Sequence, residues 1–327
     1  MTKSCSYDEK RLWLINNNNN NTVRILFMGT PEYARIIGQG LSEQSGVVMR
    51  VVSQPDACAG RKLLPIPSPV SQWAQEKGLP LDRPIRMVDF RDTWRQFAPD
   101  LIVTAAYGRI LRPWLLSLPT IAAVNLHASL LPRWRGPNPI AWAIRSGDSV
   151  TGVTLMTMDD GIDSGPILSQ VSIAIGRSAT LGDLTQSLAI AGRDLLIANL
   201  SDLMANHLTP VMQSSEGVTY APKFSPEEAH ITWQQSDEQL VNLVRSMTPS
   251  PVAYTMFRAQ RLQILKVKPE ATVGLAPGQL RIDKEGAIVG TGGGAIRLLL
   301  VKPSGKRLMT GAEWGRGIRL NGEEFLT

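Results

Sequence analysis

Short apolar runs alternate with helix-like segments over most of the chain before residue 207, and this alternation restricts the fold more than any other feature. The runs at Val23–Gly29, Val47–Ser53, Leu101–Ala105 and Ile121–Leu126 are too short for helices. A long amphipathic segment at Leu181–Met204 predicts a helix. Strands separated by helices imply a parallel sheet, so we expect an α/β, doubly wound (Rossmann-like) domain.

Length and composition predict an extension followed by two domains. The chain has 327 residues, of which 43% are hydrophobic, which is enough for two buried cores. Residues 1–22 contain six consecutive asparagines and predict a disordered extension. We expect the first domain at 23–207, a linker rich in Pro, Ser and Gly at 208–226, and the second domain at 227–327.

The second domain contains short β-like runs joined by tight turns. They are Ala253–Phe257, Leu262–Val267, Gly278–Ile282, Ala287–Gly290 and Ala295–Val301. Five such strands predict a small C-terminal β-barrel of the oligonucleotide-binding (OB) type, although a five-stranded meander would give the same pattern. Residues 220–327 hold 14 Lys plus Arg against 10 Asp plus Glu, so they carry +4 of the net charge of +6. This excess fits an anionic partner or a solvated basic face without a partner.

The cysteines and the hydropathy pattern restrict the setting of the protein. The two cysteines, Cys5 and Cys58, can form neither a disulfide framework nor a four-cysteine zinc site. We find no uncharged apolar stretch near the roughly 18 residues that a membrane span needs, and no secretory signal. We therefore expect a cytoplasmic, monomeric protein without membrane association.

One of the three histidines has the context of a functional residue. His127 lies in VNLHASLLP at the carboxyl end of an apolar strand, where open parallel sheets bind ligands. Asn125 lies two residues earlier, so both side chains point to the same side of an extended chain. The next segment, SLLPRWRGPNP at Ser129–Pro139, has the composition of a substrate loop. His207, at a helix end, and His230, expected at the surface, fit ordinary structural roles.

A second segment, TLMTMDDGIDSGPIL, carries three carboxylates in a turn after a strand. The turn lacks the acidic spacing and the closing glutamate of a helix-loop-helix calcium site, so we expect no metal. Asp159 and Asp160 fit turn-capping roles. Asp163, between Gly161 and Gly165, is our candidate for the carboxylate that faces the histidine.

Asn125, His127 and Asp163 together indicate a reaction in which the substrate supplies the nucleophile. Ser129 lacks the small-residue elbow of a nucleophilic serine, and Cys58 lies in a distant loop. An amide and an imidazolium can stabilise the oxyanion of a tetrahedral intermediate, which is commonly worth about 3 to 4 kcal/mol per donor. The carboxylate would keep the imidazole charged and help to move protons.

The motifs resemble a known family. NLHASLLPRWRG with a downstream GIDSG resembles the signature of folate-dependent formyltransferases, and the RWRG continuation is similar to that of the members acting on methionyl-tRNA. Four further segments agree: FMGTPEYA, VVSQPDACAGR, IVTAAYGRIL and YAPKFSPEEAHITW, which start at Phe27, Val51, Ile102 and Tyr220. The resemblance covers about residues 23–327 and therefore both domains.

The resemblance implies a formyltransferase domain joined to a barrel. It implies that 10-formyltetrahydrofolate is the formyl donor and that the α-amino group of initiator methionyl-tRNA is the acceptor. The catalytic Asn, His and Asp of the family match Asn125, His127 and Asp163. The folate-contacting segment matches Ser129, Leu130, Leu131 and Pro132.

Charge and position indicate which residues would contact tRNA. The cations lie on a predicted long exposed loop at 54–67 and in the second domain: Arg61, Lys62, Lys266, Lys268, Arg297, Lys302, Lys306 and Arg307. Contacts of such residues with phosphates make binding sensitive to salt. The loop sequence AGRKLLPIPSPVS is less basic than the family's loop often is.

Other functions remain as alternatives. The catalytic trio also fits formyl transfer to an amino-sugar nucleotide or to glycinamide ribonucleotide, but the extra C-terminal domain, the YAPKF segment and the +4 charge favour tRNA. GTPEYA after the first strand is not the three-glycine dinucleotide fingerprint, which argues against a dehydrogenase. A protein that only binds RNA would leave the trio without a purpose.

Overall fold

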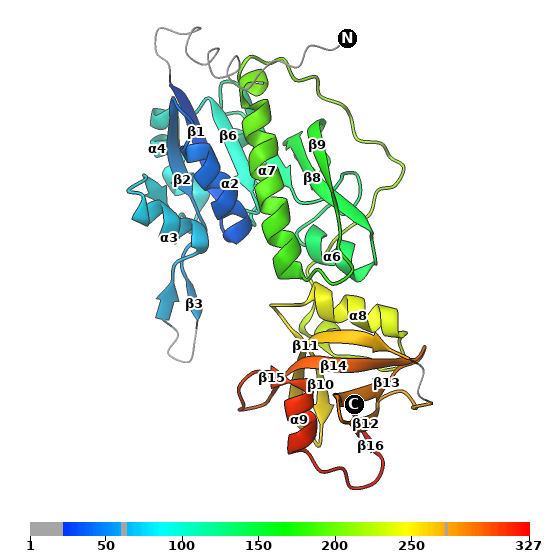
Figure 1. The fold of residues 1–327 in the computed structure, drawn as a ribbon. Helices are drawn as coiled ribbons and strands as arrows, with labels where there is room; N and C mark the ends of the chain where they lie inside the picture. Colours follow the sequence, from blue (N-terminus) through cyan, green and yellow to red (C-terminus); the bar gives the residue numbers. More distant parts are fainter. Residues whose placement is uncertain (1–21, 60–63, 272–273) are drawn as a thin grey trace. The chain divides into compact units, whose positions relative to one another are not determined.

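The computed structural model describes residues 22–59, 64–271 and 274–327 (Figure 1). Contacts between residues divide the chain into two compact units. The first runs to Pro137 and adds Gly152–Ile173 and Gln186–Tyr220, and the second contains Asn138–Thr151, Ala174–Thr185 and Ala221–Thr327. The predicted disordered extension, with its asparagine tract, lies outside the described residues except for Thr22.

A seven-stranded sheet forms the centre of the first unit, in the order β5-β2-β1-β6-β7-β8-β9. The strands are β1 (Val23–Gly29), β2 (Val47–Val52), β5 (Leu81–Asp82), β6 (Leu101–Ala105), β7 (Ala122–His127), β8 (Val150–Thr157) and β9 (Ile167–Ala174). The strands from β5 to β7 pair in parallel, and β8 pairs antiparallel with β7. This topology confirms the predicted doubly wound α/β fold, with β9 at one edge of the sheet.

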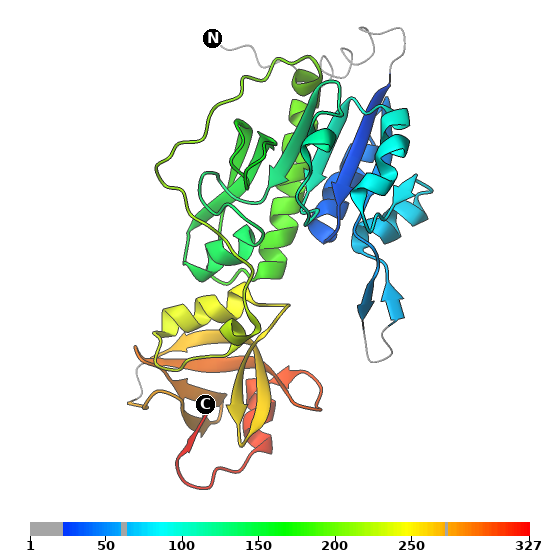
Figure 2. The same cartoon turned by 180° about the vertical axis from the view of Figure 1, so that it is seen from behind.

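Helices pack on the sheet because β1 is apolar on both faces. They are α2 (Glu32–Ser42), α3 (Pro69–Glu76), the 3-10 helix η1 (Met87–Phe90), α4 (Arg91–Phe97), α5 (Pro113–Leu116) and α7 (Leu181–Met204). Figure 1 shows α2 and α7 in front of the sheet, and Figure 2 shows the opposite face with α4. Phe27 of β1 packs edge-on against Trp73 of α3 at 6.4 Å between ring centroids. Leu26 points the other way and joins Trp94 of α4. Helix α7 has the predicted bounds.

The predicted loop at 54–67 is partly regular. Residues Ala57–Ala59 (β3) and Leu64–Ile66 (β4) pair as a two-stranded antiparallel hairpin. The prediction of a loop throughout was wrong because each strand has only three residues and one contains a proline, so no alternation is visible in the sequence. The tRNA candidates Arg61 and Lys62 lie outside the described residues.

The second unit is built on a curled antiparallel sheet with the order β10-β11-β14-β13-β12-β16, and β15 pairs with β14. The strands are β10 (Ala253–Phe257), β11 (Gln260–Glu270), β12 (Gln279–Asp283), β13 (Gly286–Gly290), β14 (Ala295–Pro303), β15 (Met309–Thr310) and β16 (Glu324–Phe325). The backbone of Thr327 exchanges two hydrogen bonds with Met256 of β10, at 2.6 and 3.0 Å, which brings the two ends of the sheet together. The five predicted strands are confirmed, and the sheet forms a half-barrel.

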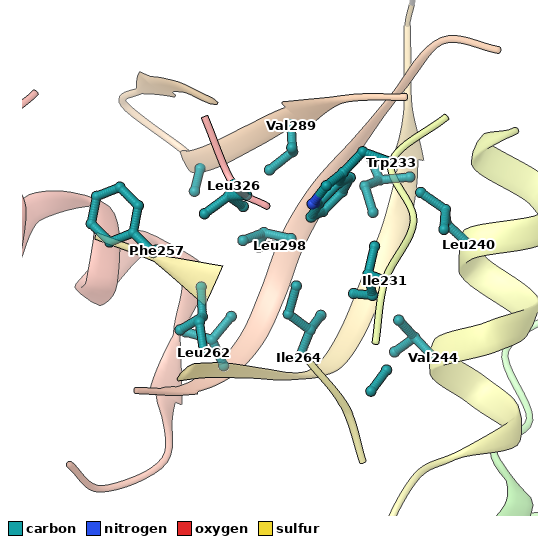
Figure 3. Close-up of a cluster of buried hydrophobic side chains, with 14 of the residues drawn as sticks. Ile231, Trp233, Leu240, Val244, Phe257, Leu262, Ile264, Val289, Leu298 and Leu326 are labelled. Carbon is teal, nitrogen blue, oxygen red and sulfur yellow. The ribbon is translucent and has the colours of Figure 1, made fainter. Parts of the chain in front are cut away.

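One apolar core holds the second unit together (Figure 3). Trp233 lies in this core, and its indole nitrogen donates to Thr255 Oγ1 at 3.0 Å. The helical elements of this unit are α6 (Pro139–Arg145), η2 (Pro226–Ala229), α8 (Asp237–Ser246) and α9 (Gly311–Gly317). The sequence analysis missed α9, which has three glycines but begins with a capping box between Thr310 and Glu313. None of the helices in the described ranges has the length and apolarity needed to cross a bilayer.

Candidate active site

Strand β7 brings Asn125 and His127 to one side of the sheet at its carboxyl end. Asn125 lies opposite Thr104 of β6, and His127 lies opposite Thr154 of β8. Because side chains alternate along a strand, residues two apart share a face. His127 is buried, with 5% of its surface exposed, whereas Asn125 is partly exposed. The amide is therefore open to a ligand, and the imidazole is held by the protein.

Asp163 lies in the loop after β8 and has a left-handed backbone conformation, with φ of 49°. The chain passes so closely at Gly165 that a Cβ there would lie 1.9 Å from the carbonyl oxygen of Thr157. Asp159 accepts a hydrogen bond from the Gly161 amide at 3.1 Å, which is the turn-capping role predicted for it. The glycines and the capped turn thus fix where the Asp163 carboxylate lies.

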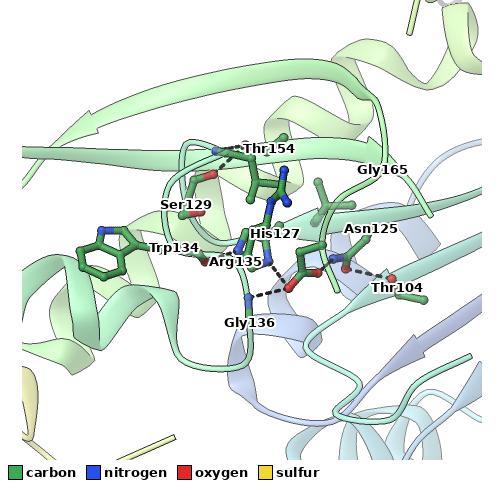
Figure 4. A network of polar contacts seen from close by, with 12 residues as sticks. Thr104, Asn125, His127, Ser129, Trp134, Arg135, Gly136, Thr154 and Gly165 are labelled. Atoms are coloured by element: carbon green, nitrogen blue, oxygen red, sulfur yellow. Dashed lines mark hydrogen bonds and ion pairs between the residues drawn. The ribbon is translucent and has the colours of Figure 1, made fainter. Parts of the chain in front are cut away.

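The carboxylate of Asp163 contacts the side chains of both Asn125 and His127, which Figure 4 shows as dashed lines. Asp163 Oδ2 lies 3.5 Å from His127 Nδ1, and Asp163 Oδ1 lies 3.4 Å from Asn125 Nδ2. The backbone amide of Gly136 donates to Asp163 Oδ2 at 2.8 Å. The structure therefore brings together the three residues that the sequence analysis selected from two distant segments.

The second ring nitrogen of His127 is bound to the backbone. Nε2 lies 2.8 Å from the carbonyl oxygen of Trp134. A carbonyl oxygen only accepts, so Nε2 carries a hydrogen and donates it. When Nδ1 is also protonated, the imidazolium forms an ion pair with Asp163. The loop after β7 thus fixes the orientation of the ring from the side opposite the carboxylate.

Thr104 orients the amide of Asn125, a role that the sequence analysis missed. Its hydroxyl lies 2.9 Å from Asn125 Oδ1. With the oxygen held there, the amide nitrogen points toward Asp163 and has a second hydrogen to offer a substrate oxygen. A threonine inside the apolar run LIVTA looks like any β-branched strand residue, so the sequence contains no signal for this contact.

The predicted linker also reaches the site. The side-chain amide of Gln213 donates to the carbonyl oxygens of Asp163 and Gly165, at 2.8 and 2.9 Å. Its oxygen accepts two hydrogen bonds from the guanidinium of Arg135, at 3.0 and 2.7 Å. Thr219 accepts from the amide of Trp134 at 2.9 Å through its hydroxyl oxygen. These residues lie in a segment without periodicity, which gave no local signal of a function.

The candidate folate residues form a buried turn after β7. Ser129 and Leu131 are buried, and Leu130 and Pro132 are partly exposed. The Ser129 hydroxyl donates to the Arg133 carbonyl oxygen at 2.6 Å. This hydrogen bond within the protein helps to give the turn a fixed shape.

Five of the six candidate tRNA-binding cations of the second unit are exposed. Lys266, Lys268, Lys302, Lys306 and Arg307 are exposed. Among these, Arg307 lies 3.9 Å from a carboxylate oxygen of Glu313.

The prediction that Arg297 contacts phosphate was wrong. This residue is only 5% exposed, and its guanidinium binds the carboxylates of Glu270 and Asp283, with distances of 2.8 and 2.9 Å to the latter. The hydrogen bonds that Arg297 donates to Asp283 and Glu270 raise the pKa of Arg297, and the bonds to Asp283 lower the pKa of that carboxyl. Sequence shows the charge of an arginine but not the carboxylates that neutralise it after folding.

The other two histidines make contacts within the protein. His230 is partly exposed, packs against Tyr254, and its Nε2 lies 3.2 Å from the Thr327 carbonyl oxygen. His207 follows α7, and its amide donates to the Asp202 carbonyl oxygen at 2.8 Å. In the described parts of the chain, no group of three or more His, Cys, Asp or Glu residues could hold a metal ion.

Two solved structures with similar folds illustrate the likeness. One is an N-formyltransferase from Helicobacter canadensis in complex with folinic acid and dTDP-3-aminofucose, with a TM-score of 0.63, 16% identity and coverage of 84% of this chain and 98% of that chain. Another is HypX from Aquifex aeolicus in complex with tetrahydrofolic acid, with a TM-score of 0.62, 18% identity and coverage of 89% of this chain and 46% of that chain. At such identities the likeness shows the fold.

Sequence comparison gives a closer relationship. The Formyl transferase model matches residues 23–200, and the model of the formyl transferase C-terminal domain matches residues 223–319. The methionyl-tRNA formyltransferase of Streptomyces avermitilis is 39% identical, with 93% of this chain and 99% of the relative covered. That of Acidithiobacillus ferrooxidans is 41% identical, with 90% and 96% covered. Two matching domains and this identity over nearly the full length show that the chain belongs to the methionyl-tRNA formyltransferase family.

Proposed function

We propose that this chain transfers the formyl group of 10-formyltetrahydrofolate to the α-amino group of initiator methionyl-tRNA, which gives N-formylmethionyl-tRNA for translation initiation. The observation that carries the proposal is the contact of the Asp163 carboxylate with both Asn125 and His127. Relatives that match over nearly their full length are methionyl-tRNA formyltransferases, which supports methionyl-tRNA as the acceptor. We propose the cytoplasm as the site of the reaction, because its substrate is used in protein synthesis.

The reaction needs stabilisation of a negative oxygen. The amine nitrogen attacks the formyl carbon, a C–N bond forms, and the carbonyl oxygen becomes an oxyanion. Collapse of this intermediate breaks the bond to the folate nitrogen, which gains a proton as the amine loses one. Asn125 can donate an amide hydrogen to the oxyanion, and a charged His127 adds a positive field beside it. Each such donor is commonly worth about 3 to 4 kcal/mol in the transition state.

Asp163 has two functions in this scheme. It holds the imidazolium of His127 in place through the contact at 3.5 Å. Only the neutral amine attacks, so a proton must leave the acceptor. Asp163 is partly exposed and touches both donors of the site, which places it to accept that proton directly or through a water molecule.

We assign the formyl donor to the turn after β7. Leu130 and Pro132 are its partly exposed members, so we propose that they contact the folate. Ser129 and Leu131 are buried and would keep the turn in shape. Solved structures with this fold include complexes with folinic acid and with tetrahydrofolic acid, which supports a folate donor.

We assign tRNA contacts to the exposed cations of the second unit. They are Lys266, Lys268, Lys302, Lys306 and Arg307. Arg61 and Lys62, which lie between β3 and β4 in the sequence, are further candidates. Each phosphate contact that these residues make should add to the salt dependence of binding.

The test is a formyl-transfer assay with initiator and elongator methionyl-tRNA side by side and an amino-sugar nucleotide as a third acceptor. We expect formylation of the initiator tRNA in the presence of 10-formyltetrahydrofolate. Rapid formylation of the amino sugar without product on tRNA would overturn the acceptor, and no transfer to any of the three would overturn the reaction.

A further inference from the structure

Two irregular loops supply the groups that hold His127. The loop after β7 contains the Trp134 carbonyl oxygen that binds Nε2, and the loop after β8 contains the Asp163 carboxylate that faces Nδ1. The backbone amide of Gly136 in the β7 loop donates a hydrogen bond to the Asp163 carboxylate of the β8 loop, which links the two loops directly. The position of the imidazole therefore depends on how these loops are held relative to each other.

Gln213 connects the two loops with all the polar groups of its side chain. Its nitrogen donates to two carbonyl oxygens of the β8 loop, those of Asp163 and Gly165. Its oxygen accepts from both Nε and Nη2 of Arg135 in the β7 loop. One of the bonded carbonyls belongs to the reactive carboxylate residue itself, so this contact fixes the backbone from which that side chain extends.

A second contact anchors the same stretch of chain. Thr219 accepts from the backbone amide of Trp134 through its hydroxyl and from that of Arg135 through its carbonyl oxygen, both at 2.9 Å. Residues 213–219 thus bind the β7 loop at two points six residues apart. A segment that only spaced two domains would have no need of these contacts.

We propose that Gln213 is a positioning residue for catalysis, which holds Asp163 and the Trp134 carbonyl at the separation that fits the His127 ring. The inference rests on the proposed function, because its main readout is formyl transfer. Without the side chain, the β8 loop loses two hydrogen bonds and the carboxylate can move away from the imidazole. A displacement of about 1 Å in a catalytic group can cost about 100-fold in rate.

The test compares Gln213→Ala, Gln213→Glu and the control Ser215→Ala in the full chain. Ser215 is exposed in the same stretch, and no side-chain hydrogen bond of Ser215 is found in the described structure. We expect Gln213→Ala to lower kcat about 10- to 100-fold with the KM for tRNA nearly unchanged. Glutamate keeps the acceptor for Arg135 but loses both donors, so Gln213→Glu should lower kcat at least as much. Full activity of the glutamate variant would show that only the contact with Arg135 matters and would overturn the proposal.

A double-mutant cycle with Asp163→Asn separates positioning from general destabilisation. If Gln213 acts through the carboxylate, adding Gln213→Ala to Asp163→Asn should lower kcat by less than about 3-fold further. Hydrogen exchange at the amides of residues 134–136 should rise in Gln213→Ala, because the Gly136 amide loses its fixed acceptor. Additive losses of kcat in the cycle, or unchanged exchange, would overturn the proposal. An inactive wild-type chain would instead count against the proposed function.

Discussion

Replacing Asp163 by asparagine removes the charge at the centre of the site and nearly preserves its shape. With an effective dielectric constant of about 20, a charge pair at the 3.5 Å between His127 Nδ1 and Asp163 Oδ2 interacts by about 5 kcal/mol. If the transition state loses that amount, kcat falls roughly 10³-fold, because about 1.4 kcal/mol corresponds to each factor of ten. The asparagine oxygen can still accept from Gly136, so the fold should persist.

Single-turnover formyl transfer and tRNA binding, measured on the same preparations, check this expectation. Asp160→Asn is the matched control, because it makes the same chemical change at an exposed carboxylate of the same loop. We expect the control to keep wild-type kcat and both variants to bind tRNA like the wild type. A loss of less than about 10-fold in Asp163→Asn, or a parallel loss of kcat and tRNA affinity, would refute the electrostatic reasoning.

Thr104→Val removes the hydroxyl that holds Asn125 and should lower kcat roughly 2- to 10-fold, the usual contribution of one hydrogen bond. Thr104→Ser keeps the hydroxyl and should retain activity. Equal rates in both variants would contradict the role of Thr104 in orienting Asn125. Lys302→Gln should weaken tRNA binding and flatten its salt dependence in affinity titrations between about 50 and 200 mM salt, whereas Arg297→Gln should lower the melting temperature and leave that dependence unchanged. Folding lowers the pKa of Asp283 through its hydrogen bonds with Arg297, so the stability it contributes is present above its unfolded pKa of about 4 and is lost as the pH falls through the folded pKa. The gap in melting temperature between wild type and Asp283→Asn should therefore narrow below about pH 4, and a constant gap would contradict the linkage.

Elements rich in buried apolar residues could be predicted from the sequence, whereas elements held by local polar contacts could not. Helix α7 and strands β1 and β10 have the predicted bounds, since burial of one or both faces dictates their residues. Helix α9 was missed because its signal is a capping box followed by glycines instead of an apolar stripe. The β3–β4 hairpin was missed because its strands are too short to alternate.

The candidate site divides in the same way. Asn125 and His127 could be predicted together because the strand period of two places them on one face at a strand end. Asp163 stands out because glycines surround it. Thr104 and Gln213 could not be found, since each acts through side-chain hydrogen bonds of a residue type common in strands and loops. Such a contact exists only after segments far apart in the chain, 50 residues in the case of Gln213 and Asp163, have come together.

The chemistry of the contact between the loops explains why an amide suits position 213. The position must donate to two carbonyl oxygens and accept from a guanidinium, and a glutamine side chain supplies both kinds of group without a net charge. A lysine could donate to the carbonyls, but its positive charge would also attract the Asp163 carboxylate and weaken the pairing of that carboxylate with His127. A glutamate could pair with Arg135 but would place a second negative group beside the reactive carboxylate. A neutral side chain with both donors and an acceptor can hold the loops and leave the electrostatics of the histidine to Asp163 alone.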